Sequence, residues 1–208
     1  MSVSAKDIGL KRLKHSEHKG FSDVLLTGKY MKIPKVPDKV TSAVKRLTSR
    51  IVPGQQPQYV KVLIESDAEI NECFVNLERK IKRDGGKIQL GWAIWYLPGI
   101  LMEAEFHAVW ISPEGKLIDI SPRPIQFKDI MFLPDTNIVY RGKQIDNIRI
   151  PLNKDPKVKE YIRLCEEFFK IINEGELAFK HGPISIPHDR IEPLRQRLAE
   201  LSAELGII

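Results

Sequence analysis

Residues 107–122, HAVWISPEGKLIDISP, contain two apolar runs separated by the turn residues Pro113-Glu114-Gly115. A short turn between two β-like runs predicts an antiparallel hairpin. In a hairpin centred on this turn, residue 107 pairs with about residue 120, so Asp119 is expected beside His107. The two side chains share a face only in the right register, because a slip of one residue moves a side chain to the other face.

The segments upstream extend this hairpin. Residues 87–97 and 100–112, KIQLGWAIWYL and ILMEAEFHAVWIS, are two β-like runs separated by Pro98-Gly99. Before them, residues 66–86 carry apolar side chains at helical spacing and end in two glycines. This spacing predicts a helix with Cys73 on or beside its buried face. We therefore expect a cysteine-bearing helix, followed along the chain by an antiparallel meander that carries His107 and Asp119.

The predicted helix could begin at either of two positions. Ser66 and Glu69 form a potential capping box, which would begin the helix early and bury Cys73 in its second turn. Alternatively Asn71 is the N-cap, which is the interpretation we favour, and Cys73 then lies in the first turn.

Cysteine, histidine and aspartate together suggest nucleophilic chemistry. A thiol attacks acyl carbons as a thiolate, which needs a base within hydrogen-bond reach, and the base needs a third group to fix its tautomer. Cys73, His107 and Asp119 can fill these roles in this order. The alternative is that the three residues have no catalytic role. Cys73 would then be a core residue, His107 a histidine with satisfied hydrogen bonds and Asp119 a surface residue. The residues considered as a second donor to an oxyanion are Asn71, Gln56 and Gln58.

This arrangement resembles the transglutaminase-like branch of the papain-like cysteine-enzyme superfamily. The pattern of that branch is a Cys at a helix start, a His-Ala-Trp-like strand and an Asp followed by Pro one or two residues later. Here the second motif reads His-Ala-Val-Trp and the third Asp-Ile-Ser-Pro, and the resemblance covers about residues 66–124. It implies an α+β, papain-like fold in which the Cys73 helix packs on an antiparallel sheet.

The resemblance also implies roles. Cys73 would be the nucleophile, His107 the general base and later the general acid, and Asp119 the orienting carboxylate, while the N–H of the nucleophile helps to bind the oxyanion. The implied reaction is acyl transfer through a thioester on a protein, peptide or amine substrate. Amide or peptide hydrolysis, glutamine deamidation and transfer to an amine all remain open, and no cofactor or metal is expected.

Other side chains are candidates for the walls of this site. Glu105 alternates with Phe106, so it shares a strand face with His107 and is expected either to tune the charge of His107 or to lie on a solvated polar face. Trp92 and Trp110 are expected to be core residues or pocket walls. The other histidines have no cysteine or carboxylate partners at metal-ligand spacing, so no zinc site is expected.

The rest of the chain predicts further elements. We expect a short helix over residues 38–51 with Asp38 as its N-cap, and a strand or entry segment at residues 59–65. Residues 137–142 and 147–152 are expected to be strands. Helices are expected at residues 155–174 and over a C-terminal segment from Glu192 to Leu205. We divide the chain into a basic N-terminal extension, residues 1–50, and a catalytic domain, residues 51–208.

Charge is distributed unevenly along the chain. Residues 1–50 carry 12 Lys and Arg against 4 Asp and Glu, whereas residues 51–208 carry 21 against 23. The basic segment is either a solvated extension or a site that attracts an acidic protein or nucleic acid. An alternative function is therefore an inactive papain-like module that binds through this segment. Neither a long apolar run nor a signal peptide is present, so we expect a cytoplasmic protein with two free thiols and no membrane partner.

Overall fold

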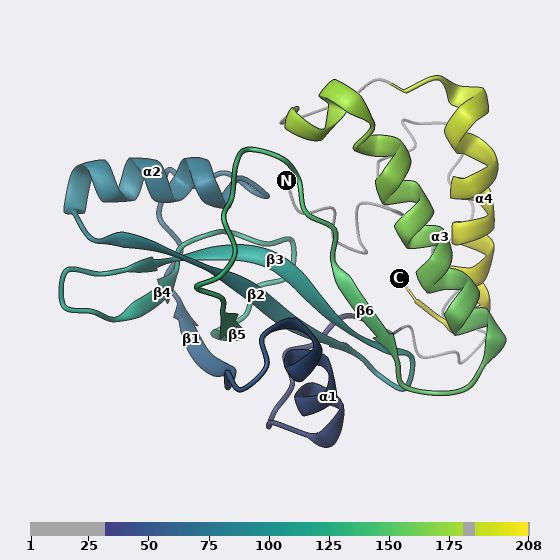
Figure 1. The fold of residues 1–208 in the computed structure, drawn as a ribbon, viewed down its shortest axis with the longest axis horizontal. Helices are drawn as coiled ribbons and strands as arrows, with labels where there is room; N and C mark the ends of the chain where they lie inside the picture. The colour runs from purple at the N-terminus through teal and green to yellow at the C-terminus, as the bar shows by residue number, and fades with distance from the viewer. Residues whose placement is uncertain (1–31, 181–185, 208) are drawn as a thin grey trace, which may run out of the picture.

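The computed structural model describes residues 32–180 and 186–207. Five strands form a closed ring in the order β2-β5-β1-β4-β3, because β2 also pairs with β3, and β6 adds to β3 outside the ring. Helices lie around this barrel, with α2 along one side and α3 and α4 paired at the opposite end (Figure 1). The predicted α+β class is confirmed.

The longest elements are the two strands of the central hairpin, β2 (Lys87–Leu97) and β3 (Leu101–Ile111). They pair antiparallel along their whole length, with Gly91 opposite His107. The short strand β4 (Leu117–Asp119) then returns along the other edge of β3. The meander predicted from the sequence is therefore present.

The sheet differs from the expected antiparallel one in two respects. Strand β1 (Gln58–Val62) runs parallel to β4, because the chain crosses over through α2, β2 and β3 before it returns. Strand β5 (Asp129–Pro134) closes the ring between β1 and β2 and was not predicted. Nearly all of β5 is buried, so it lacks the alternation that identifies a half-exposed strand.

One of the two strands predicted after β5 is absent. Residues 137–142, expected to be a strand, form bends and irregular structure instead. Strand β6 (Ile148–Pro151) agrees with the expected strand at residues 147–152 and pairs with residues 101–104 of β3.

One edge of β3 is left partly open. Along that edge β6 pairs with residues 101–104 and β4 with residues 110–111. Among the described strands, none pairs with residues 105–109 on this edge. His107 lies at the centre of this opening.

Helix α1 (Ser42–Ile51) begins later than predicted. Its N-cap is Thr41, whose side chain accepts a hydrogen bond from the N–H of Val44, so the assignment of Asp38 was wrong. Val44 and Leu47 are fully buried against the sheet. The domain boundary placed after residue 50 therefore falls inside a helix that belongs to the core.

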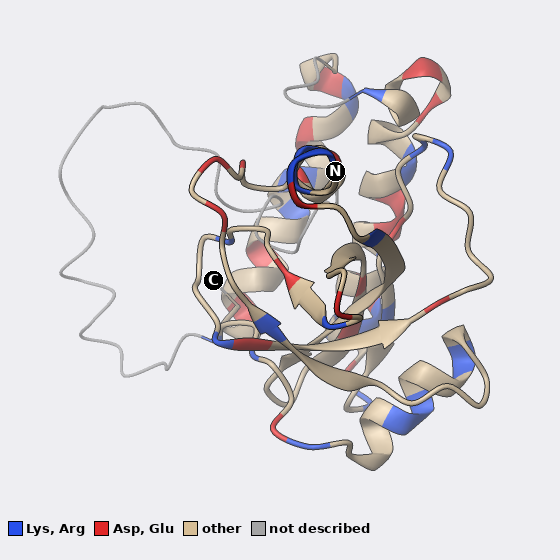
Figure 2. Cartoon of the chain, turned by 90° about the vertical axis from the view of Figure 1, so that its left-hand side faces the viewer, with Lys and Arg blue, Asp and Glu red and all other residues tan. Residues whose placement is uncertain are grey.

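The exposed face of α1 is basic. It carries Lys45, Arg46 and Arg50, and the helix contains no acidic residue (Figure 2). Residues 1–31 lie outside the described part of the chain. Binding of an acidic protein or nucleic acid to the basic N-terminal segment stays a prediction.

Two helices pack against the end of the central hairpin. Helix α3 (Pro156–Ile172) agrees with the predicted one, and α4 (His188–Leu205) begins four residues before Glu192. A short helical segment, η2 (Gly175–Phe179), follows α3. Over residues 32–180 and 186–207, no helix is both long and apolar enough to cross a membrane.

Helix α2 (Cys73–Asp84) packs on β3 as predicted. Leu77 is fully buried against Ala108 and Trp110, and the indole Nε1 of Trp110 donates to the carbonyl of Gly85, 2.9 Å away. Gly86 follows at φ 89°, and a Cβ there would meet the carbonyl oxygen of Ile111 at 2.3 Å. Only glycine fits this close approach, which anchors the C-terminal end of α2 to the barrel.

Candidate active site

Cys73 is the first residue of α2. The N-cap is Glu72, and the preceding Asn71 has a positive φ of 66°, a left-handed conformation that asparagine tolerates. The capping box of Ser66 and Glu69 was therefore wrong, and the favoured cap, Asn71, lies one residue too early. Cys73 stands where helical N–H groups lack intrahelical acceptors and carry partial positive charge, so anionic groups are favoured there.

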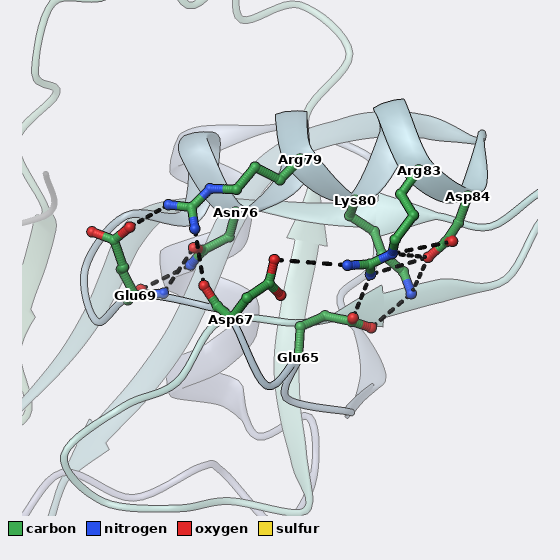
Figure 3. Close-up of polar contacts among 8 residues, drawn as sticks. All are labelled: Glu65, Asp67, Glu69, Asn76, Arg79, Lys80, Arg83 and Asp84. Atoms are coloured by element: carbon green, nitrogen blue, oxygen red, sulfur yellow. Dashed lines mark hydrogen bonds and ion pairs between the residues drawn. The ribbon is translucent and has the colours of Figure 1, made fainter.

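A buried amide fixes the loop that leads into this helix. The Oδ1 atom of Asn76 accepts from the N–H of Glu69 at 2.9 Å, and its Nδ2 atom donates to the carbonyl of Glu69 at 2.8 Å (Figure 3). Asn76 is only 4 % exposed. The two hydrogen bonds hold the entry loop against the first turns of α2 and so position Cys73.

Ion pairs reinforce the same contact along the helix (Figure 3). Glu65 accepts from Lys80 at 2.6 Å and from Arg83 at 2.5 Å, and Arg79 pairs with Glu69. Pairs at the surface of this kind contribute little individually, because solvent screens their charges. Together they join the loop before Cys73 to the later turns of α2.

His107 and Asp119 form a buried pair. The Nε2 atom of His107 lies 3.1 Å from Oδ1 of Asp119, and the two residues are 4 % and 0 % exposed. Strands β3 and β4 pair Trp110 with Ile118, which places Asp119 level with Val109. Residues two apart share a strand face, so this register brings the carboxylate to the face of His107.

Both oxygens of Asp119 accept further hydrogen bonds. Oδ1 also accepts from the N–H of Ser121 at 3.0 Å, and Oδ2 accepts from Nη1 of Arg123 at 2.5 Å. Burial alone would raise the pKa of Asp119, but the positive charges of His107 and Arg123 outweigh it and hold this pKa well below its usual range. Asp119 is therefore an ionised and firmly held carboxylate.

The same contacts set the charge of His107. Burial would lower the pKa of His107, but the negative charge of Asp119, the hydrogen bond that the ring donates to this carboxylate and the hydrogen bond with Cys73 raise it to about 10, against an opposing effect of Arg123. His107 is then an imidazolium at neutral pH. Because Nε2 faces Asp119, the nitrogen left for the Cys73 thiol is Nδ1.

The chain thus brings Cys73, His107 and Asp119 together. The nucleophile candidate is partly exposed, whereas the histidine and the aspartate behind it are buried. A partly accessible sulfur beside an imidazolium at a helix N-terminus is the environment in which cysteine reacts as a thiolate. Chemically, the arrangement can hold a thiolate, deliver a proton and stabilise an oxyanion at the N–H of Cys73.

An aromatic cluster surrounds Phe74, the residue that follows Cys73 on α2. The ring of Phe74 stacks on Tyr140 with centroids 3.9 Å apart, and Phe106 packs against both rings. Trp92 meets Phe106 edge to face and donates from Nε1 to Asp135 at 3.2 Å. Trp92 is therefore a core residue beside this aromatic cluster.

The hydroxyl of Tyr140 lacks a hydrogen-bond partner in the described part of the protein, although it is buried. Burial raises the pKa of Tyr140, and the negative charges of Cys73 and Glu72 add to this effect. A buried hydroxyl without a partner calls for an explanation, and here it lies within electrostatic reach of the nucleophile candidate.

The structure does not bring the other oxyanion candidates to Cys73. Gln56 and Gln58 are exposed at the beginning of β1, whereas Val62, at its other end, pairs with Asp119. Asn71 lies two residues before Cys73 and is exposed. Trp110 lies at the opposite end of α2 from Cys73, where it bonds Gly85.

Glu105 lies in the interior on the His107 face of β3. Its Oε2 atom accepts from the indole Nε1 of Trp95 at 2.6 Å, and its charge raises the pKa of Arg123 together with Asp119, against the lowering effect of burial. Farther along the same face, Glu103 pairs with Arg149 at 2.8 Å. This face is therefore buried rather than solvated.

Sequence reasoning missed Arg123 and Tyr140. A basic residue immediately after the Asp-Ile-Ser-Pro motif was a usable signal for Arg123, because a buried carboxylate needs a counter-charge. No comparable signal marks Tyr140, which lies in the segment expected to be a strand.

Within the described residues, no group of three or more His, Cys, Asp or Glu side chains is placed to hold a metal ion. Comparisons with protein-family models, with curated proteins and with solved structures found no match for this chain.

Replacing Asp119 tests the electrostatics of the pair. In Asp119→Asn the carboxylate is lost while burial and Arg123 still lower the pKa of His107, so it should fall from about 10 toward or below the ordinary 6.5. NMR titration of the imidazole, assigned by its loss in His107→Gln, measures this. Asp189→Asn, at an exposed position on α4, is the matched control and should leave the titration unchanged. A His107 midpoint that does not move in Asp119→Asn would contradict the pairing.

Proposed function

We propose that the chain is a cysteine-dependent acyl-transfer enzyme of the transglutaminase-like, papain-like kind. The observation that carries this proposal is the contact of Cys73, at the N-terminus of α2, with a buried imidazole that bonds Asp119 at 3.1 Å. The Cys73 helix packed on strands that carry His107 and Asp119 supports the papain-like assignment.

The first half of the reaction forms a thioester. The Cys73 thiolate attacks the acyl carbon, and the electron pair of the carbonyl bond moves to oxygen to give a tetrahedral oxyanion. When this intermediate collapses, the bond to the leaving group breaks, and the leaving group takes the proton from Nδ1 of His107. Asp119 holds the ring by Nε2 during this transfer, so that Nδ1 stays directed at the reacting atoms.

The second half releases the acyl group. Water or an amine gives a proton to the neutral His107 and attacks the thioester carbon. The carbon–sulfur bond then breaks, and the thiolate and imidazolium are restored. With water the result is hydrolysis or deamidation, and with an amine it is transfer, so a protein, peptide or amine substrate is compatible with the same residues.

The proposal uses two groups to bind the oxyanion. The N–H of Cys73 has no acceptor within the helix because it lies in the first turn. The ring of Tyr140 stacks on the adjacent Phe74, and its buried hydroxyl lacks a partner in the described part of the protein. The proposal assigns these two donors to the substrate carbonyl oxygen.

A purely structural module explains the site less well. A buried group of Asp119, His107 and Arg123 requires desolvation of three ionisable side chains, and apolar residues of similar volume are often equally stabilising. The cost of burying these three side chains is explained if their charges take part in a reaction. The rival proposal, an inactive binding module, predicts an ordinary and unreactive Cys73.

Thiol alkylation separates the two proposals. Brief treatment with iodoacetamide across a series of mildly acidic pH values should label Cys73 much faster than an ordinary exposed thiol, because a neighbouring imidazolium and a helix N-terminus favour the reactive form of the sulfur. His107→Ala should remove most of this advantage. Mass mapping of the native protein gives the rate at each cysteine.

Two controls accompany that experiment. Cys165 is buried, and burial raises its pKa to about 12, so it should stay unlabelled. The Glu78→Cys variant in a Cys73→Ser background supplies an exposed thiol on the same helix, and its rate should rise about tenfold for each pH unit below a pKa of about 8.5. If Cys73 reacts no faster than this control thiol across the pH series, the enzyme proposal fails.

The role of Tyr140 is tested by Tyr140→Phe. Attack on an ester passes through an oxyanion and alkylation does not, so p-nitrophenyl acetate turnover should fall about 10–1000-fold, as when one oxyanion donor is lost. Alkylation of Cys73 should stay within about twofold, because the ring that stacks on Phe74 is retained. Equal losses in both reactions, or no loss in either, would reject the assignment.

A further inference from the structure

Arg123 adds a second cation to the pair of His107 and Asp119. Its Nη1 atom donates to Oδ2 of Asp119 at 2.5 Å, and its Nη2 atom lies 3.1 Å from Nε2 of His107. Two positively charged groups therefore share one buried carboxylate. The sequence motif alone assigns no role to this arginine.

The contact between Arg123 and His107 is not an ordinary hydrogen bond. A guanidinium has only donors, and the Nε2 atom of an imidazolium also carries a hydrogen, which it gives to Asp119. The two groups consequently repel each other while both bind the carboxylate. Asp119 stabilises the imidazolium, and Arg123 opposes that stabilisation.

Several contacts hold the guanidinium of Arg123 beside His107. Besides Asp119, it donates to the carbonyl of Ser121 at 3.4 Å and lies 5.3 Å from the ring centroid of Trp95, as in a cation–π contact. Trp95 is fixed in turn by its hydrogen bond to Glu105. Only 14 % of the Arg123 side chain is exposed.

The groups that act on His107 come from every element around it. Cys73 on α2 and Asp119 on β4 favour its charged form, and Arg123, after β4, disfavours it. Glu105, on the same strand, acts on Arg123. From β5 the ring of Phe132 lies nearly perpendicular to the imidazole, with ring centroids 6.5 Å apart. Arg123 is thus the positive charge in this set that opposes the imidazolium.

We propose that Arg123 is a positioning residue that limits how strongly Asp119, bound at Nε2, stabilises the imidazolium of His107, so that Nδ1 can give its proton to the leaving group. It does so by binding Oδ2, which leaves Oδ1 for the ring, and by placing a fixed positive charge beside Nε2. This inference rests on the acyl-transfer function proposed above.

The consequence depends on the leaving group. A p-nitrophenolate leaves without a proton, whereas phenolate and amines, which are more basic, need one from His107 at collapse. A general acid that holds its proton too tightly slows only the second kind of reaction. Loss of Arg123 should therefore steepen the dependence of rate on the basicity of the leaving group.

The experiment compares release of p-nitrophenol and of phenol from the two acetate esters by the full-length wild type, Arg123→Gln and Arg123→Lys. In Arg123→Gln, thioester formation from p-nitrophenyl acetate should stay within about twofold, while that from phenyl acetate should fall about tenfold or more. The NMR titration midpoint of His107 should rise above about 10 in this variant. Arg123→Lys, which keeps the charge, should restore most of both properties.

The outcomes are distinguishable. Equal loss with both esters and an unmoved titration midpoint would mean that Arg123 only supports the fold, and this inference would be overturned while the proposed function stands. Unchanged rates with both esters would overturn it as well. If wild-type protein forms no acetyl-Cys73 from either ester, the proposed function itself fails, and the role of Arg123 in catalysis fails with it.

Discussion

The ionised carboxylate of Asp119 is the interaction on which both the fold and the site depend. It is fully buried and accepts hydrogen bonds from His107, from the backbone of Ser121 and from Arg123. Asp119 is also the last residue of β4, the strand that joins β1 to β3 and closes the barrel. An unpaired carboxylate in this position would be strongly destabilising, so these hydrogen-bond partners stabilise the closed barrel.

Two separate anchors bring Cys73, the proposed nucleophile, to this carboxylate. At its C-terminal end α2 is held by the Trp110 contact with Gly85, and at its N-terminal end Asn76 fixes the entry loop through Glu69. On the edge of β3 that faces away from β2, no described strand pairs with residues 105–109, and this opening leaves His107 accessible to Cys73. A rigid scaffold thus presents a partly exposed sulfur to a buried imidazolium, the division of roles that nucleophilic cysteine chemistry requires.

Much of the candidate site could be predicted from the sequence, because its residues lie in elements that short sequence patterns identify. The turn at Pro113-Glu114-Gly115 and the helical spacing before Gly85 placed the three residues in their elements. The register of β3 against β4 could not be predicted exactly, because a shift of one residue decides whether Asp119 faces His107. The structure pairs Trp110 with Ile118, which is shifted by one residue from the pairing expected from the turn. Strand β5 and the roles of Arg123 and Tyr140 depend on contacts between distant segments, which periodicity does not reveal.

The most direct measurement is the detection of an acyl-enzyme. Full-length protein is mixed briefly with p-nitrophenyl acetate, quenched in acid and mapped by mass spectrometry, with and without hydroxylamine, which removes acetyl groups from thioesters but not from lysine amides. The account predicts a hydroxylamine-sensitive acetyl group on Cys73 that disappears in His107→Ala and is absent from Cys165. Acetylation confined to lysines, or equal acetylation of Cys73 with and without His107, would contradict it.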